Sequence, residues 1–104
     1  RGREAMIELL ALPQPPDAVF CQNDMLARGA LAAIAEAGLS VPGDISVLGL
    51  DEREFARDLG LSTMLLPDAE MAERAINILT GPRQLDLPAT ISIRCRLIPR
   101  QTTR

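Results

Sequence analysis

Short apolar runs, separated by stretches with helical periodicity, are the feature that most constrains how this chain can fold. Residues 18–21 (AVFC), 45–50 (ISVLGL) and 62–66 (STMLL) are short and largely apolar. Runs of this kind are typical of strands buried on both faces of a parallel sheet. Residues 89–98 (ATISIRCRLI) instead alternate apolar with polar side chains, which predicts a strand with one solvent-exposed face.

The segments around these runs carry helical patterns. Apolar residues recur at helical spacing over 3–12, 24–37 and 67–80, and residues 52–60 predict a short helix or turn. Strands that alternate with helices favour an α/β fold, here a parallel sheet with flanking helices. Gly29 lies in the second turn of the helix over 24–37, where glycine costs about 0.5–1 kcal/mol relative to alanine. We therefore expect a close packing contact with a neighbouring strand at this glycine.

Composition narrows the possible partners of the chain. Its 104 residues form one domain at most, with 47% apolar and 24% charged residues, as in ordinary globular proteins. The net charge is −3, and the 11 arginines are scattered among 14 acidic residues, which argues against a nucleic-acid-binding surface on this chain. No apolar run approaches the length of a membrane span, so we expect no membrane partner.

The absence of histidine narrows the possible chemistry. It removes Ser-His and Cys-His nucleophile pairs, histidine metal ligands and the commonest general base at neutral pH. Cys21 and Cys95 lie in apolar strand-like segments, and we interpret them as buried free thiols rather than a disulfide, which suits a reducing cytosol. The sequence predicts no catalytic residue, no metal site and no cofactor.

Polar side chains follow two of the predicted strands. Asn23 and Asp24 come just after strand 18–21, and Asp51 comes directly after strand 45–50. In open parallel sheets, ligands bind beyond the carboxyl ends of the strands. If these two strands are neighbours, Asn23 and Asp51 point into one crevice, where an amide and a carboxylate suit hydroxyl groups or ring nitrogens.

Structural roles compete with ligand binding at each of these positions. Asn and Asp are both favoured helix N-caps, and a cap contributes about 0.5–2 kcal/mol. For Asp24 we favour the cap over ligand contact, and for Asn23 we favour the ligand. The pattern does not decide for Asp51. The charged residues that follow, from Glu52 to Asp58, predict a solvated face.

Residues 17–52 contain an apolar strand, an N-D pair, a small residue and a glycine in the helix, and then G-L-x-V-P-x-D-I-S-V-x-G-x-D. This segment resembles a known family, the LacI/GalR-type bacterial transcriptional repressors. The C-terminal segment RLIPRQTT, residues 96–103, resembles the family's L-x-x-R-x-S/T tail. The matching residues are Asn23, Asp24, Ala27, Gly29, Gly38, Leu39, Val41, Pro42, Asp44, Ile45, Ser46, Val47, Gly49 and Asp51.

The resemblance implies the C-terminal part of a two-lobed effector-binding core, a partial lobe of the type I periplasmic-binding-protein kind. Residues 1–66 and 89–104 would belong to the C-terminal lobe. The helix over 67–80 would pack on an N-terminal lobe that these 104 residues do not contain. The family's helix-turn-helix headpiece, which contacts DNA, is likewise expected outside this chain.

The resemblance also implies a function. A small-molecule effector, sugar-like or a similar polar metabolite, would lie between the lobes of a cytoplasmic homodimer and control DNA binding. The family's effector contacts fall on Asn23 and Asp51, with Asp24 beside them. Two departures bear on the effector: Leu66 stands where the family often places a polar crossover residue, and the chain has no Trp or Tyr.

Two other classes of protein remain open on the sequence. A periplasmic solute receptor shares the lobes and a similar N-D and G-x-D pair, although VPGDISV, the R-Q-T-T close and free cysteines favour the repressor. An α/β enzyme is the third class. The lack of histidine and of a glycine-rich phosphate loop argues against it.

Overall fold

The computed structural model describes residues 1–81 and 90–104, and confirms the predicted α/β class. The predicted helices agree with the observed ones to within two residues at each end. The helices are α1 (Gly2–Leu10), α2 (Asp24–Glu36), α3 (Glu54–Asp58) and α4 (Asp68–Thr80), and the strands are β1 (Ala18–Phe20), β2 (Ser46–Leu50), β3 (Ser62–Leu65) and β4 (Arg96–Ile98).

The four strands form one sheet in the order β1-β2-β3-β4. The first three strands are parallel, with Val19 opposite Val47 and Leu48 opposite Ser62. Strand β4 runs antiparallel to β3, so the sheet is mixed at this end rather than wholly parallel. Strands β1 and β2 are direct neighbours, as the predicted crevice at their carboxyl ends requires.

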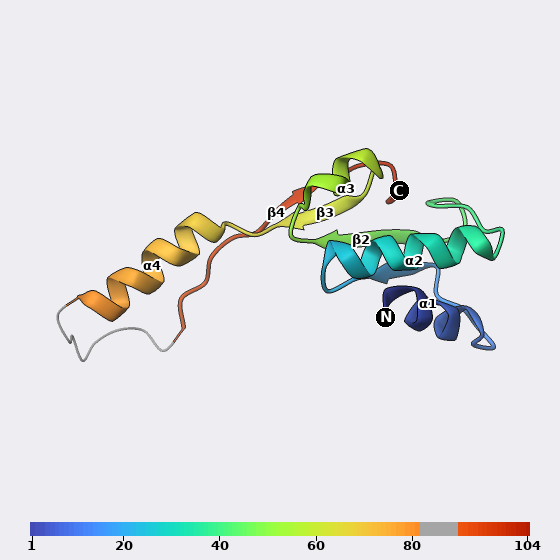
Figure 1. The fold of residues 1–104 in the computed structure, drawn as a ribbon, viewed down its shortest axis with the longest axis horizontal. Coiled ribbons are helices and arrows are strands. Elements are labelled where there is room, and N and C mark those ends of the chain that lie inside the picture. Colours follow the sequence, from blue (N-terminus) through green and yellow to red (C-terminus); the bar gives the residue numbers. More distant parts are fainter. Residues whose placement is uncertain (82–89) are drawn as a thin grey trace.

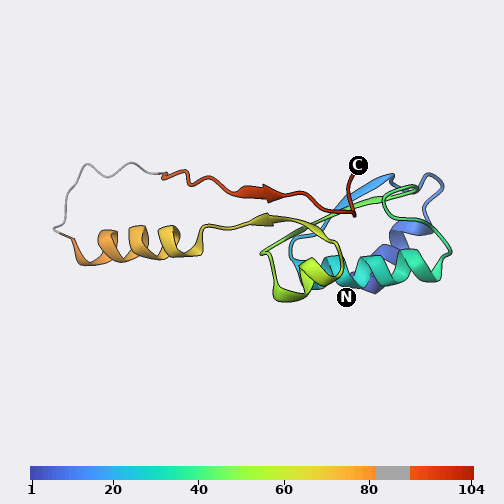
Figure 2. The same cartoon turned by 90° about the horizontal axis from the view of Figure 1, so that it is seen from above.

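Strand β4 is much shorter than the pattern predicts. The alternation indicated a strand over 89–98, but only Arg96–Ile98 pairs with β3, and residues 90–95 form no ladder. Residue 89 lies outside the described residues. Strand β3 ends at Leu65, where the chain turns towards α4, so residues 90–95 run back with no strand beside them (Figures 1 and 2). Alternation alone does not make a strand without a pairing partner.

The core lies between the sheet and the helices α1, α2 and α3, which cover one face of the sheet (Figure 2). On the opposite face the C-terminal tail places Thr103 beside Ser62, whereas Phe20 on β1 is 63% exposed. The prediction that the apolar strands are buried on both faces is therefore met at the start of β3, where Ser62 and Thr63 are both buried, but not in β1. The buried apolar side chains are Met6, Ala27, Ala30, Ala33, Ile34, Ile45, Val47, Ala56 and Leu61.

Helices α1 and α2 cross at two glycines. A Cβ atom on Gly29 would lie 2.7 Å from the backbone nitrogen of Arg3, and one on Gly2 would lie 2.3 Å from the carbonyl oxygen of Leu26. Only glycine at both positions allows so close an approach of the two backbones. The predicted close contact at Gly29 is therefore present, but its partner is the first turn of α1 rather than a strand.

The C-terminal tail fills the gap between the starts of β2 and β3. Thr102 is buried; its carbonyl oxygen accepts from the amide of Val47 at 2.7 Å, and its Oγ1 accepts from the amide of Ser62 at 2.8 Å. The same Oγ1 donates to the carbonyl oxygen of Val47 at 2.7 Å. One threonine thus joins both strands and satisfies backbone groups that would otherwise be buried without partners.

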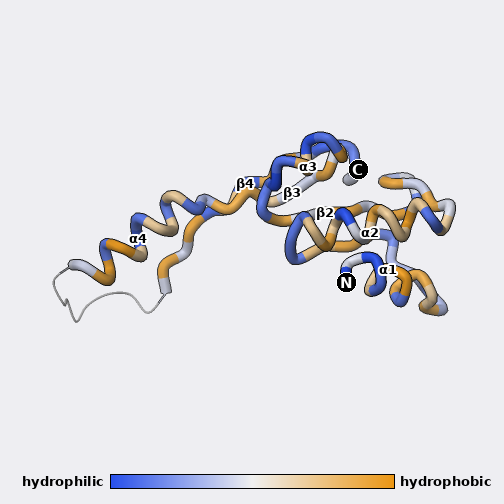
Figure 3. The backbone as a smooth tube through the Cα atoms, viewed as in Figure 1, coloured by the Kyte–Doolittle hydropathy of each residue, from blue (hydrophilic) through white to orange (hydrophobic). Residues whose placement is uncertain are grey.

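We call residues 1–66 and 96–104 the lobe, and residues 67–81 with 90–95 the arm. The arm projects from the end of the sheet, and the molecule measures 57 × 29 × 22 Å (Figure 1). None of the residues of α4 is buried, and Leu79 is 83% exposed. Apolar residues nevertheless recur along the arm (Figure 3).

Both cysteines are free thiols, as predicted, but the expected burial is wrong for Cys95, which is exposed on the unpaired part of the arm. Cys21 is half-buried in the lobe. No helix among the described residues is long and apolar enough to cross a membrane.

Candidate functional site

Asn23 is the N-cap of α2. Its backbone is extended, with φ −158°, and its Oδ1 accepts a hydrogen bond from the amide of Leu26 at 2.9 Å. The preferred interpretation of Asp24 as the cap is therefore wrong, because the cap lies one residue earlier. The side chain of Asn23 is half-buried, and capping occupies its carbonyl oxygen while its NH2 group makes no hydrogen bond with the described residues.

Asp24 is a completely buried carboxylate at the start of α2. Its Oδ1 accepts from the hydroxyl of Thr63 on β3 at 2.7 Å, and its Oδ2 accepts from the amide of Arg53 at 2.7 Å. A Cβ atom on Gly49 would lie 2.2 Å from Oδ1, so glycine is needed for this carboxylate to fit against β2. Asp24 thus ties α2, β3 and the turn after β2 together, and no part of it is open to solvent.

The turn after β2 has an unusual backbone. Asp51 has φ 110° and Glu52 has φ 58°, so both are non-glycine residues with the positive φ that L-residues rarely adopt. Such conformations cost about 1–3 kcal/mol each, and they persist only where surrounding contacts hold them. We call residues 51–53 the strained turn.

Asp51 combines this backbone with an unpaired side chain. Its amide donates to the carbonyl oxygen of Met64 on β3 at 3.0 Å, which fixes the start of the strained turn. The residue is half-buried, and its carboxylate forms no hydrogen bond or ion pair with any residue the structure describes, unlike those of Asp24 and Glu52. It is therefore available to accept a hydrogen bond from a ligand.

Glu52 was predicted to belong to a solvated charged face, and the structure shows otherwise. Its carboxylate forms a two-bonded ion pair with the guanidinium of Arg100, one bond being 2.8 Å from Nη1 to Oε2. The side chains are only 21% and 13% exposed. The bonds from Arg100 hold the pKa of Glu52 below its ordinary value, although partial burial opposes this shift.

Arg100 and Thr63 are functional candidates that the sequence reasoning missed. Arg100 stands at the arginine of the R-x-T tail motif, which was a signal that could have found it. Its contacts with Glu52 span 48 positions of sequence, and no local pattern reveals such a pair. Thr63 carried no signal, because a threonine in an apolar strand is ordinary.

The surface beside the strained turn is open and charged. It is hollowed where the N-terminal turn of α2 meets α3, and the guanidinium of Arg28 lies over the ring of Phe55 at 5.6 Å from its centroid. This region offers carboxylate acceptors and arginine donors to a polar ligand. Its lining residues are Met25, Glu52, Arg53, Glu54 and Phe55.

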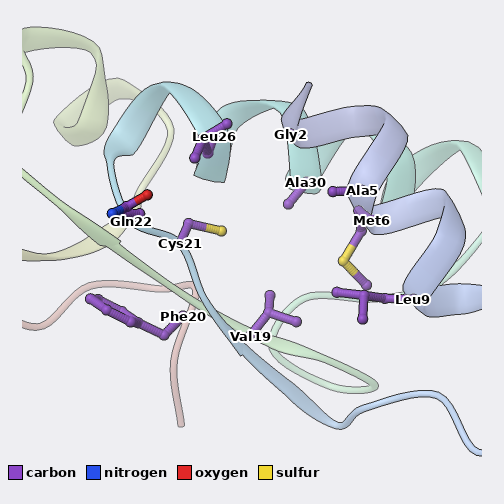
Figure 4. A pocket seen from close by; sticks show the side chains of 10 residues that line it. All are labelled: Gly2, Ala5, Met6, Leu9, Val19, Phe20, Cys21, Gln22, Leu26 and Ala30. Atoms are coloured by element: carbon purple, nitrogen blue, oxygen red, sulfur yellow. The ribbon is translucent and has the colours of Figure 1, made fainter.

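A second pocket, between α1, β1 and α2, is apolar (Figure 4). Its volume is about 170 Å³, and the side chains of Met6, Leu9 and Cys21 lie around it. Burial raises the pKa of the Cys21 thiol, with a further contribution from the charge of Asp24, so the thiol is a poor nucleophile. Apolar walls provide little to orient a polar metabolite, and the charged region at the strained turn is the better candidate.

The three predicted site residues therefore differ in their exposure to solvent. Asp24 is internal, whereas Asn23 and Asp51 are half-buried and follow two neighbouring strands. Among residues 1–81 and 90–104 there is no group of three His, Cys, Asp or Glu side chains that could hold a metal ion. The arrangement can bind and orient a polar molecule through hydrogen bonds.

Comparison with known families and proteins identifies relatives over nearly the whole chain. The family described as "Periplasmic binding protein-like domain" matches residues 1–103. The transcriptional repressor CytR of Escherichia coli K12 is 39% identical over 107 aligned residues, covering 99% of this chain and 31% of CytR. The chain thus spans about a third of the length of this curated relative, which is a repressor and not an enzyme.

Solved structures give the same result. A LacI family transcriptional regulator from Lactobacillus casei with bound sucrose is 30% identical, with a TM-score of 0.75. The match covers 98% of this chain and 39% of that regulator's chain. The lac repressor dimer, bound to operator and an anti-inducer, is 28% identical, with a TM-score of 0.77. The match covers 98% of this chain and 37% of the repressor chain.

Proposed function

We propose that this chain, a member of the periplasmic binding protein-like domain family, binds a small polar metabolite at the carboxyl ends of β1 and β2. Within that family, the chain belongs to the effector-binding portion of LacI/GalR-type transcriptional regulators. The ligand would be a sugar or a molecule of similar polarity. Binding would control the attachment of the whole regulator to DNA, in the cytoplasm and without a cofactor.

The observation that carries this proposal is the state of Asp51. The residue is half-buried, and its carboxylate has no partner among the described residues, on a strained turn at the end of a central strand. The carboxylate is therefore free to accept a hydrogen bond, which a ligand hydroxyl or N–H would supply. The sucrose bound to the relative from Lactobacillus casei supports a ligand rich in hydroxyl groups.

Asn23 is the second proposed contact. Its carbonyl oxygen already caps α2, which leaves its NH2 group as the donor for a ligand oxygen. The cap fixes the amide plane, so this donor would be oriented before the ligand arrives. Asp24 acts beneath the site: by binding Thr63 and the amide of Arg53 it would hold α2 against the strained turn.

The arm supports a two-lobed arrangement. Helix α4 is amphipathic but buries no residue in this chain, as expected if it packs on another lobe of the full-length protein. An effector between two lobes would favour one relative orientation, and a homodimer would transmit it to helix-turn-helix regions outside these 104 residues. Coupling of this kind is typically about 1–3 kcal/mol and acts equally in both directions.

The proposal is tested with Asp51→Asn in the full-length protein. Binding is measured by calorimetry and thermal shift against sucrose, glucose, nucleosides and purine bases, and operator affinity is measured without effector. A ligand that binds the wild type should bind the variant about 10–100-fold more weakly, because one charge-assisted hydrogen bond contributes about 1.5–3 kcal/mol. Operator affinity without effector should not change.

Asp17→Asn is the matched control, since Asp17 is an exposed residue directly before β1, at the opposite end of that strand from the proposed site. It should leave both affinities unchanged. Wild-type effector affinity in Asp51→Asn would contradict the assignment of this carboxylate.

A further inference from the structure

We propose that Arg100 is a positioning residue for effector binding: through Glu52 it holds the strained turn in the conformation that presents the carboxylate of Asp51. This inference rests on the proposed function of Asp51. It assigns a role to the C-terminal tail, whose arginine contacts no part of the proposed ligand site except through Glu52.

The strained turn needs restraints because two consecutive residues, Asp51 and Glu52, have positive φ. Without surrounding contacts, the backbone of both residues would relax to ordinary conformations. Relaxation would rotate the peptide planes on either side of Asp51 and change the position of its carboxylate. The geometry of the site therefore depends on what holds these residues.

Backbone hydrogen bonds hold the two ends of the turn. The amide of Asp51 donates to the carbonyl oxygen of Met64 at 3.0 Å, and the amide of Arg53 donates to Asp24 at 2.7 Å. The central residue is held less well by its backbone, since the amide of Glu52 lies 3.4 Å from the hydroxyl oxygen of Thr63. A bond of that length is weak.

The side chain of Glu52 supplies the missing restraint. Both its oxygens bind the guanidinium of Arg100, in a pair that is largely shielded from water. The positive charges of Arg57 and Arg96 add to Arg100 in holding the pKa of this carboxylate below its ordinary value. A two-bonded arginine–carboxylate pair fixes both distance and angle, so it fixes the backbone from which the glutamate projects.

Arg100 is itself fixed, as a restraining residue must be. Its amide donates to the hydroxyl oxygen of Ser62 at 2.8 Å, and its Nη1 donates to the carbonyl oxygen of Leu61 at 2.8 Å. These contacts join the arginine to the start of β3. The guanidinium can bind the carboxylate and Leu61 together because it carries several donors in a rigid plane, which a lysine ammonium cannot reproduce.

The experiment uses the full-length protein and the variants Arg100→Met, Arg100→Lys and the exchanged pair Glu52→Arg with Arg100→Glu. The probe is the compound from the sucrose, glucose, nucleoside and purine panel that binds the wild type. Arg74→Met is the control, because Arg74 pairs with Glu70 on the exposed surface of α4. All affinities are measured well below the unfolding temperature.

We expect Arg100→Met to weaken probe binding about tenfold or more, Arg100→Lys to lie between it and the wild type, and the exchanged pair to recover part of the loss. Arg74→Met should leave the affinity unchanged. Recovery by exchange requires the pair itself and would not follow if Arg100 only filled space. If Arg100→Met fails to fold, the same comparison is made with Arg100→Lys.

Hydrogen exchange tests the positioning without any effector. The amides of Asp51 and Arg53 should exchange faster in Arg100→Met, or in Arg100→Lys, than in Arg74→Met. Unchanged exchange at these two amides would overturn the inference. So would an unchanged probe affinity in Arg100→Met together with a loss in Asp51→Asn, in which case the proposed function stands and the role of Arg100 is wrong. If Asp51→Asn has no effect on binding, the proposed function fails, and the inference about effector binding fails with it.

Discussion

Helices α2 and α4 both have 13 residues and an apolar stripe, yet they lie in opposite environments. Helix α2 buries five residues against the sheet and α1, and is capped by Asn23. Helix α4 buries none and has no side-chain cap. An amphipathic pattern therefore predicts a helix in both cases, but only the neighbouring elements decide how much that helix contributes to stability.

The same contrast extends to polar contacts. In the lobe, buried bonds connect residues far apart in sequence, such as Asp24 with Thr63 and Thr102 with Val47. In the arm, the side-chain bonds join residues four positions apart within α4, on its exposed surface. The candidate site belongs to the first kind, which is why a rigid lobe can hold a strained turn.

Isoleucine truncation should give the largest difference between the two regions. Ile34 in α2 is fully buried, whereas Ile76 in α4 is 58% exposed. In the full-length protein, Ile34→Ala should lower the free energy of unfolding by about 2–5 kcal/mol, because it removes core packing and leaves a cavity. Chemical denaturation measures the change.

Ile76→Ala is the counterpart that tests the arm. If α4 packs on a second lobe, as we propose, this variant should cost at least about 1 kcal/mol in the full-length protein. A change within about 0.5 kcal/mol would mean that α4 stays as exposed as it is here, and it would refute the proposed packing.

A smaller difference should come from two threonines whose hydroxyls both donate to backbone carbonyls. Thr102→Val in the lobe deprives the amide of Ser62 and the carbonyl of Val47 of buried partners, and should cost about 2 kcal/mol. Thr80→Val in the arm removes an exposed bond to Ile76, and should change stability by less than about 0.5 kcal/mol. If the two variants lowered the denaturation midpoint equally, the hydrogen bonds from the buried tail to β2 and β3 would not be stabilising the lobe.

The smallest effect should be a dependence of stability on pH. Arg100 holds the pKa of Glu52 below its ordinary value, so the folded state binds the proton less readily than the unfolded state does. The pair therefore contributes its full stability above about pH 4.3, the ordinary value for glutamate, and loses it as the pH falls towards the lowered pKa.

Glu52→Gln isolates this contribution. Its denaturation midpoint should be lower than that of the wild type at pH 7, and the two should converge as the pH falls from 5 to 3. Glu70→Gln, which disrupts the exposed pair on α4, should follow the wild type throughout. A constant gap between Glu52→Gln and the wild type would exclude this carboxylate as the titrating group.

The sequence predicted the fold better than the site. Helical boundaries and a parallel arrangement of the first strands followed from periodicity and from the alternation of elements, whereas the adjacency of β1 and β2 was an assumption that the structure bears out. The roles of Asn23 and Asp24 did not, because both residue types suit an N-cap equally and their positions differ by one residue. Asp24 is the one that turns inward, because it binds Thr63 and the amide of Arg53. These partners lie 39 and 29 positions from Asp24 in the sequence.

By itself, the sequence determined the order of helices and strands, the lack of a histidine-based chemistry and the family resemblance, because each depends on residue type and local spacing. Tertiary structure alone decided that the alternating segment before β4 pairs over only three residues, that α4 is exposed, and that Glu52 is bound by Arg100 rather than solvated. These features arise where distant segments meet, and a periodic pattern does not specify which partner it meets.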